Sequence, residues 1–227
     1  MLCFPRDTQN KVSTNQTVTS SLPIVLPISE PTTSYLHFHM TQPTLVVING
    51  FPGVGKSTIS HALSKEKQFI HLIGDEIRKK MTKGKVLGSK DETERMLMLL
   101  DTKVEEALKK GCDVICDVNY NRLVDRERNY TIAEKHGALA VTLLFECSLD
   151  LALERNSKRS KETDAYYHDT TEESVRGVHR DREPLASWER VIVVHSEKPV
   201  AQNIDHILSV LKSKKFDYEP EQGNHPL

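Results

Sequence analysis

The hydrophobic and polar positions divide the chain at Thr44. Residues 1–43 are rich in Ser, Thr, Pro and Gln, hold few charges, and show neither helical nor strand periodicity. Segments of this composition bury too little apolar surface to order themselves. We therefore expect a disordered leader over 1–43, with Met40 as an alternative start of the chain.

From Thr44 onward, apolar runs alternate with helical patterns, which is typical of a parallel sheet with helices on both faces. The expected strands are residues 44–49, 69–74, 113–118, 139–146 and 191–194. The expected helices are 56–65, 91–110, 123–136, 149–160, 171–181 and 200–212. A short helix is expected after Asp75, and Asp91 or Thr93 is expected to cap the helix over 91–110. The pattern predicts one α/β domain over 44–212, a five-stranded parallel sheet, and a disordered tail over 213–227.

Composition limits the partners of this domain. The 227 residues suffice for one buried core, and 31 Lys and Arg against 32 Asp and Glu give no global attraction to polyanions. The four cysteines lack metal-site spacing, and no apolar stretch is long enough to span a bilayer. These features favour an intracellular, cytoplasmic protein without a membrane partner; a mitochondrial transit peptide in the leader is the alternative.

A phosphate-binding loop follows the first expected strand. The stretch "GFPGVGKST" fits G-x-x-x-x-G-K-[ST] between a buried strand and a helix, as the mechanism of this motif requires. Its glycines let backbone N–H groups surround phosphate, its lysine reaches the β- and γ-phosphates, and its serine coordinates Mg²⁺. We predict ATP and Mg²⁺ as cofactors, bound by Gly50, Phe51, Pro52, Gly53, Val54, Gly55, Lys56, Ser57 and Thr58.

The rest of the chain narrows the reaction. A GTPase would need a guanine-reading Asn-Lys-x-Asp segment, which the sequence lacks, and a large ring ATPase would need a helical second domain. A kinase needs a polar group that accepts a hydroxyl proton and basic residues on a lid. A kinase is therefore the favoured class, with a P-loop ATPase or nucleotide-binding switch as the alternative.

Candidate residues for the acceptor side end the second and third strands. Asp75 falls at the carboxyl edge of the sheet, where ligands bind in open α/β folds, and Arg78 lies one helical turn later. Asp117 closes the third strand as a Walker-B carboxylate would, so it is expected to hold Mg²⁺ through water, and Asn119 is expected to hydrogen-bond the substrate or Asp75. The structural alternatives are a helix N-cap for Asp75 and a strand-end turn for Asp117 and Asn119.

A candidate lid over about residues 155–183 follows the fourth strand. Arg155 and Arg159 are spaced i, i+4 and share one helix face, beside Lys158 and Lys161. This basic helix end predicts a lid that closes over phosphates, the alternative being a solvated helix face. Downstream, Trp188 is expected to pack against the sheet, with stacking on a base as the alternative.

Taken together, these motifs resemble the P-loop polynucleotide 5′-hydroxyl kinase family, in its phage-type and animal forms. "GFPGVGKST" looks like the family loop, "DEIR" matches its D-x-x-R element, "CDVNYN" is similar to its D-x-T-N turn, and "RNSKR" matches the phage-type lid. In this family the aspartate of D-x-x-R activates the acceptor hydroxyl, its arginine binds a phosphate of the nucleic acid, and the lid arginines bind ATP phosphates. The resemblance carries these roles to Asp75, Arg78, Arg155 and Arg159.

The sequence departs from this family in three ways, one of which is a longer and more acidic segment after "RNSKR". Val118 replaces the threonine of D-x-T-N, and no D-x-D-G-T phosphatase motif occurs. The same scaffold also phosphorylates small molecules, as in zeta-toxin-like, antibiotic and gluconate kinases. We therefore predict an ATP-dependent phosphotransferase that acts on a polynucleotide 5′-hydroxyl, with a small-molecule or nucleoside acceptor as the alternative.

Overall fold

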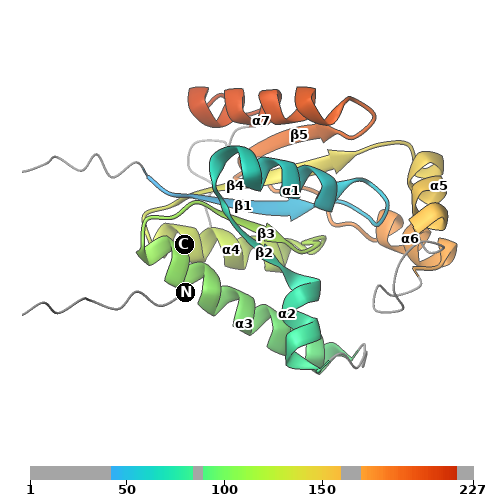
Figure 1. Cartoon of the computed structure of the whole chain (residues 1–227), viewed down its shortest axis with the longest axis horizontal. Coiled ribbons are helices and arrows are strands. Elements are labelled where there is room, and N and C mark those ends of the chain that lie inside the picture. Colours follow the sequence, from blue (N-terminus) through green and yellow to red (C-terminus); the bar gives the residue numbers. More distant parts are fainter. Residues whose placement is uncertain (1–41, 84–88, 160–169, 219–227) are drawn as a thin grey trace, which may run out of the picture. The chain divides into compact units, whose positions relative to one another are not determined.

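A five-stranded parallel sheet forms the centre of the chain (Figure 1), seen in a computed structural model that describes residues 42–83, 89–159 and 170–218. The strands are β1 (Thr44–Asn49), β2 (Ile70–Ile73), β3 (Val114–Asp117), β4 (Leu139–Glu146) and β5 (Val191–His195). They lie in the order β2-β3-β1-β4-β5 and every pairing is parallel. The predicted α/β fold is confirmed, and β1 occupies the middle of the sheet.

Helices cover both faces of this sheet. One face carries α1 (Lys56–Lys67) and α7 (Val200–Ser213), and the other carries α3 (Lys90–Lys109) and α4 (Leu123–Lys135) (Figure 1). Three shorter helices lie toward the carboxyl ends of the strands: α2 (Gly74–Met81), which packs on α3, and α5 (Leu149–Arg159) and α6 (Glu172–Arg180), which pack on each other. The predicted site residues lie in α2 and α5, in the loop between β1 and α1 and the first turn of α1, and at or just after the end of β3.

The alternation of side chains along β1 builds two separate cores. Leu45 and Val47 are fully buried among residues of α3 and α4, whereas Val46 and Ile48 are fully buried among residues of α1 and α7. Successive residues of a strand point to opposite faces, so a strand covered on both sides is apolar at every position. This requirement explains the uninterrupted run of apolar residues by which β1 could be predicted from the sequence.

Most elements end within one or two residues of their predicted limits, and the start of α3 shows how one difference arises. The N-cap is Ser89, whose hydroxyl accepts a hydrogen bond from the backbone N–H of Glu92 at 3.1 Å. The prediction of Asp91 or Thr93 as the cap was wrong. Ser89 and Glu92 have the S-x-x-E spacing of a capping box, which starts the helix earlier than the acidic run suggested.

The ordered domain extends past both of its predicted limits. Before β1, the carbonyl of Pro43 accepts a hydrogen bond from the N–H of Leu139 at 2.7 Å. After α7, Tyr218 forms an antiparallel bridge with Val191 at the start of β5. The rest of the predicted leader, the rest of the tail and the middle of the predicted lid lie outside the described residues. Within the described ranges, no helix has the length and apolar character needed to cross a membrane.

Candidate active site

The loop between β1 and α1 has the backbone shape of a phosphate-binding nest. Gly53 and Gly55 adopt positive φ angles of 84° and 94°. A Cβ atom on Gly53 would lie 2.2 Å from the carbonyl oxygen of Ala152 in α5. Only glycine combines these angles with so close an approach, so α5 packs directly against the loop. Ser57 and Thr58 are exposed on the first turn of α1, whose N–H groups can donate hydrogen bonds to a bound anion.

Two hydrogen bonds fix the beginning of this loop. The backbone N–H of Gly50 donates to Oδ1 of Asn119 at 3.2 Å, and Nζ of Lys56 donates to the carbonyl oxygen of Phe51 at 2.9 Å. Asn119 therefore joins the end of β3 to the P-loop, a contact that differs from the predicted ones with substrate or Asp75. The loop and the end of β3 form one connected surface.

Asp75 lies in the first turn of α2, and its side chain is 54% exposed. The N-cap of α2 is Ile73, so the alternative role of Asp75 as an N-cap is excluded. Gly74 precedes it, and a Cβ atom there would lie 2.5 Å from Cγ2 of Val118. This close packing holds the start of α2, and with it Asp75, against the carboxyl end of β3.

Arg78 lies between two carboxylates. Its Nη1 is 3.5 Å from Oδ1 of Asp75, and its Nε is 3.3 Å from Oε1 of Glu92 on α3. The side chains of Arg78 and Glu92 are 18% and 3% exposed. Because a carboxylate this buried is costly without a cation beside it, Glu92 and Arg78 compensate each other. Sequence reasoning missed Glu92.

Asp117 has a partner that the sequence analysis also missed. Its Oδ2 lies 3.2 Å from Nε2 of His71 on β2, and both side chains are largely buried. The one sequence signal was a histidine inside an otherwise apolar strand. This contact orients the carboxylate at the end of β3, next to Asn119.

The lid arginines are only partly described. Both terminal nitrogens of Arg155 bond to Ser196 after β5, Nη1 to its hydroxyl at 3.1 Å and Nη2 to its carbonyl at 2.9 Å. Arg155 also lies beside Gly55 of the P-loop. The backbone of Arg159 ends α5, while its side chain and Lys161 lie outside the described parts of the chain. Lys158 pairs with Glu154 on the same helix.

The segment between α6 and β5 is held by buried contacts with α4. Arg126 and Glu189 are both fully buried and form an ion pair at 3.0 Å. Trp188 is also buried, with its ring packed edge-on against Tyr130 at 5.0 Å, so its predicted role in the core is confirmed. These residues are structural, and nothing in the sequence pattern had singled out Arg126 or Glu189.

Residues 45–185 match the model of a protein family, AAA_33, described as an AAA domain. This match covers more than half of the 227 residues. The chain belongs to this family. The matched range runs from β1 to the segment after α6, so the AAA domain contains the P-loop, Asp75 and helices α5 and α6.

Solved structures share the fold of this AAA domain at low sequence identity. A candidate kinase from Chloroflexus aurantiacus has a TM-score of 0.61 at 20% identity, covering 77% of this chain and 98% of that one. A sugar kinase from Janibacter has a TM-score of 0.55 at 17% identity, covering 76% and 95%. A gluconokinase from Sinorhizobium meliloti has a TM-score of 0.55 at 17% identity, covering 76% and 93%. These similarities confirm a P-loop NTPase fold.

The oxygen atoms beside the P-loop of this AAA domain fit the predicted magnesium ion. Magnesium is held in nucleotide sites by hydroxyl and carboxylate oxygens together with substrate phosphates. Ser57 offers an exposed hydroxyl, and Asp117 offers a carboxylate that His71 orients. Within the described residues no group of three or more His, Cys, Asp or Glu could hold a metal by itself. The donor set suits an ion that is completed by the phosphates of a nucleotide.

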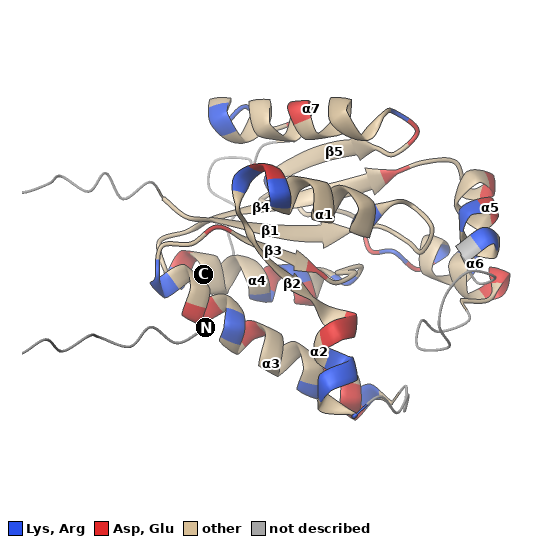
Figure 2. Cartoon of the chain, in the orientation of Figure 1, with Lys and Arg blue, Asp and Glu red and all other residues tan. Residues whose placement is uncertain are grey.

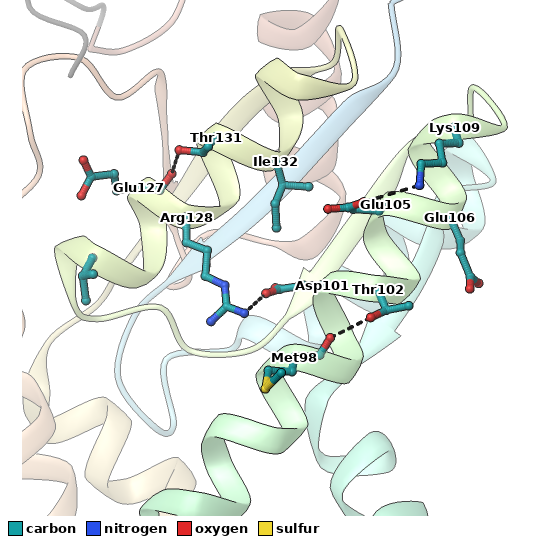
Figure 3. Close-up of a pocket in the computed structure, with 11 residues that line it drawn as sticks. Met98, Asp101, Thr102, Glu105, Glu106, Lys109, Glu127, Arg128, Thr131 and Ile132 are labelled. Atoms are coloured by element: carbon teal, nitrogen blue, oxygen red, sulfur yellow. Dashed lines mark hydrogen bonds and ion pairs between the residues drawn. The ribbon is translucent and has the colours of Figure 1, made fainter. Parts of the chain in front are cut away.

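A groove of about 760 Å³ lies away from these residues, between α3 and α4 (Figure 3). Its walls carry Met98 and Val124, and Asp101 pairs with Arg128 across it. Burial raises the pKa of the Asp101 carboxyl, although the Arg128 guanidinium beside it acts in the opposite direction. None of the predicted site residues lines this groove, so it is separate from the candidate active site.

Proposed function

We propose that this protein is an ATP-dependent kinase that transfers the γ-phosphate of ATP to a hydroxyl group of a small molecule. The P-loop holds the triphosphate, Asp75 faces the acceptor, and Arg155 and Arg159 cover the transferring group. The kinases among the structures of similar fold support this class of reaction.

The transfer uses these residues as follows. A carboxylate oxygen of Asp75 accepts the proton of the acceptor hydroxyl while the hydroxyl oxygen attacks the γ-phosphorus. The bond between that phosphorus and the β,γ-bridging oxygen breaks, and ADP leaves with the electron pair. Lys56 and the two arginines stabilise the charge on the phosphate oxygens. Ser57 and Asp117 would hold Mg²⁺, which supplies further charge neutralisation at the phosphates.

The pairing of Arg78 with Glu92 is the observation that favours a small acceptor. In a polynucleotide kinase this arginine would bind a phosphate of the nucleic acid, but here its Nε lies 3.3 Å from the buried carboxylate of Glu92. Figure 2 shows acidic residues on α2 and α3 as well as basic ones, which include Arg78, Lys79 and Lys80 in the last turn of α2. The sugar kinase and gluconokinase of similar fold also point to a small acceptor.

Acceptor-dependent release of ADP tests this proposal. Purified protein with ATP and Mg²⁺ is offered sugars, polyols, sugar acids, nucleosides and a 5′-hydroxyl oligonucleotide, with Lys56→Ala as the inactive control. We expect one class of small hydroxyl compound to stimulate ADP release and to gain a phosphate detectable by mass spectrometry. Stimulation by the oligonucleotide alone would restore the polynucleotide acceptor, and hydrolysis that no acceptor changes would indicate an ATPase or switch.

A further inference from the structure

Arg182 lies in a cavity beside the P-loop, on the segment that leads from α6 to β5. The cavity has a volume of about 350 Å³, and its walls include Phe51 of the P-loop, Glu146 at the end of β4, and Glu197 after β5. The ring of Phe51 packs edge-on against His179 of α6 at 4.8 Å between centroids. Arg182 therefore follows a helix that contacts the P-loop, and it lines the cavity.

The backbone around Arg182 is held firmly. The N–H of Glu183 donates to the carbonyl of Asn121 at 3.1 Å, and the carbonyl of Pro184 accepts from Nη2 of Arg126 at 2.6 Å. Arg126 is itself fixed by the buried pair with Glu189. The backbone of Arg182 therefore has a defined position before any ligand binds, which lowers the entropy that binding must overcome.

The guanidinium of Arg182 has an unsatisfied donor. Its Nη1 is shut off from solvent and has no hydrogen-bond partner, and Arg182 takes part in none of the ion pairs found among the described residues. Two acids also line the cavity. Glu197 accepts from the N–H of Ser148 at 2.9 Å, and Glu146 lies 3.9 Å from Nδ1 of His195.

The neighbouring arginines of α6 provide a contrast, because each is exposed and paired. Arg176 bonds to Glu172 at 2.7 Å, and Arg180 bonds to Asp181 at 2.8 Å. A buried guanidinium nitrogen without an acceptor costs stability, whereas a phosphate oxygen would satisfy it with a strong charge-assisted bond. Arg182 thus lines the cavity and carries a donor that no protein group satisfies.

We propose that Arg182 binds the terminal phosphate of the nucleotide held by the P-loop. The cavity reaches the loop at Phe51, whose carbonyl holds Nζ of Lys56, and the lysine of such a loop reaches the β- and γ-phosphates. Arg155, proposed to cover the same phosphate, approaches the loop at Gly55. The inference rests on the proposed function only in taking ATP as the ligand.

Binding of ATP and ADP, measured by calorimetry without any acceptor, tests this assignment. Arg182→Ala should weaken ATP binding about tenfold, or about 1.4 kcal/mol, while ADP affinity changes by less than about twofold. Arg182→Gln, which keeps the aliphatic stem and a polar amide but removes the charge, should lose the same preference for ATP. Arg182→Lys should recover part of it. Arg180→Ala removes an exposed arginine of the same segment and should bind both nucleotides as the wild type does.

The outcomes separate the two proposals. Wild-type ATP affinity in both Arg182→Ala and Arg182→Gln, or an equal loss for ATP and ADP, would overturn the role of Arg182 while leaving the kinase proposal intact. Failure of the wild-type protein to bind either nucleotide would overturn both. Unchanged ADP binding in a variant shows that the P-loop is folded, so a selective loss of ATP binding cannot come from unfolding.

Discussion

The side-chain oxygen of Asn119 accepts a hydrogen bond from the backbone N–H of Gly50 at 3.2 Å, which joins the end of β3 to the first residue of the P-loop. Asn119→Ala should remove a contact worth about 1 kcal/mol, because one hydrogen bond of the loop is lost. We expect ATP affinity to fall about fivefold, with the KM of the acceptor unchanged. Titration of ATP binding and acceptor kinetics on one preparation measure the two effects. A raised acceptor KM with unaltered ATP binding would instead make Asn119 a substrate-binding residue.

Asp75→Asn should abolish most turnover while leaving the protein folded. The substitution keeps the shape of the side chain but removes its ability to accept a proton, a contribution of about 10²- to 10⁴-fold. ATP affinity should stay near the wild-type value, since Asp75 is predicted to face the acceptor. Glu76→Gln is the matched control, because Glu76 is the next residue of α2 and pairs only loosely with Lys80, at 3.9 Å. Full activity in Asp75→Asn would reject this residue as the base.

Breaking the buried pair of Arg126 and Glu189 should destabilise the domain strongly. Both side chains are fully buried, so Arg126→Ala leaves an uncompensated carboxylate and should cost about 3–5 kcal/mol in the free energy of unfolding. Arg122→Ala breaks the exposed pair with Asp125 and should cost less than about 1 kcal/mol. Urea denaturation of the two variants gives the comparison. Equal losses of unfolding free energy in the two variants would mean that burial does not increase the cost of breaking the pair.

The cysteines should differ sharply in reactivity. Burial raises the pKa of the Cys116 thiol from 9.0 to about 12, while Cys112 and Cys147 are only partly buried. Since the thiolate is the reactive form, iodoacetamide at pH 8 should label Cys112 and Cys147 of the folded protein well before Cys116. Peptide mass spectrometry measures the order, and early labelling of Cys116 would contradict its burial.

The same shift has a defined effect on stability. An elevated pKa in the folded state means that the neutral thiol stabilises the fold fully below pH 9.0, and that this contribution is lost as the pH rises toward 12. Replacing Cys116 by Ala should therefore remove part of the alkaline destabilisation between these values. Denaturation curves across this range, compared with those of the wild type, measure the difference.

The sequence predicted those features that depend on neighbouring residues. The P-loop could be recognised because its glycines, lysine and serine follow one another in the chain, and β1 because both of its faces are buried. The partners of the predicted polar residues could not be recognised. His71 meets Asp117 across 46 positions, and Arg126 meets Glu189 across 63. Such pairs are made by strand order and helix packing, which the local pattern does not encode.

Arg78 illustrates how this limitation affected the predicted function. The D-x-x-R pattern marked it as a phosphate-binding residue, but its surroundings depend on how α2 packs against α3. Only that packing brings Glu92 to it. A motif therefore identifies the residue, whereas the charge that the residue can offer to a ligand is set by the fold.

Because β1 lies in the centre of the sheet, the site residues on its two sides come from two different stretches of the sequence. Asp75 and Arg78 on the β2 side come from the chain before Asn121, whereas Arg155 and Ser196 on the β4 and β5 side come from the chain after Glu146. The residues proposed to meet the acceptor lie on α2, separate from those of the P-loop, so α2 can change while the loop is kept. Such a modular arrangement allows one phosphate donor to be kept while new substrates are acquired in the course of evolution.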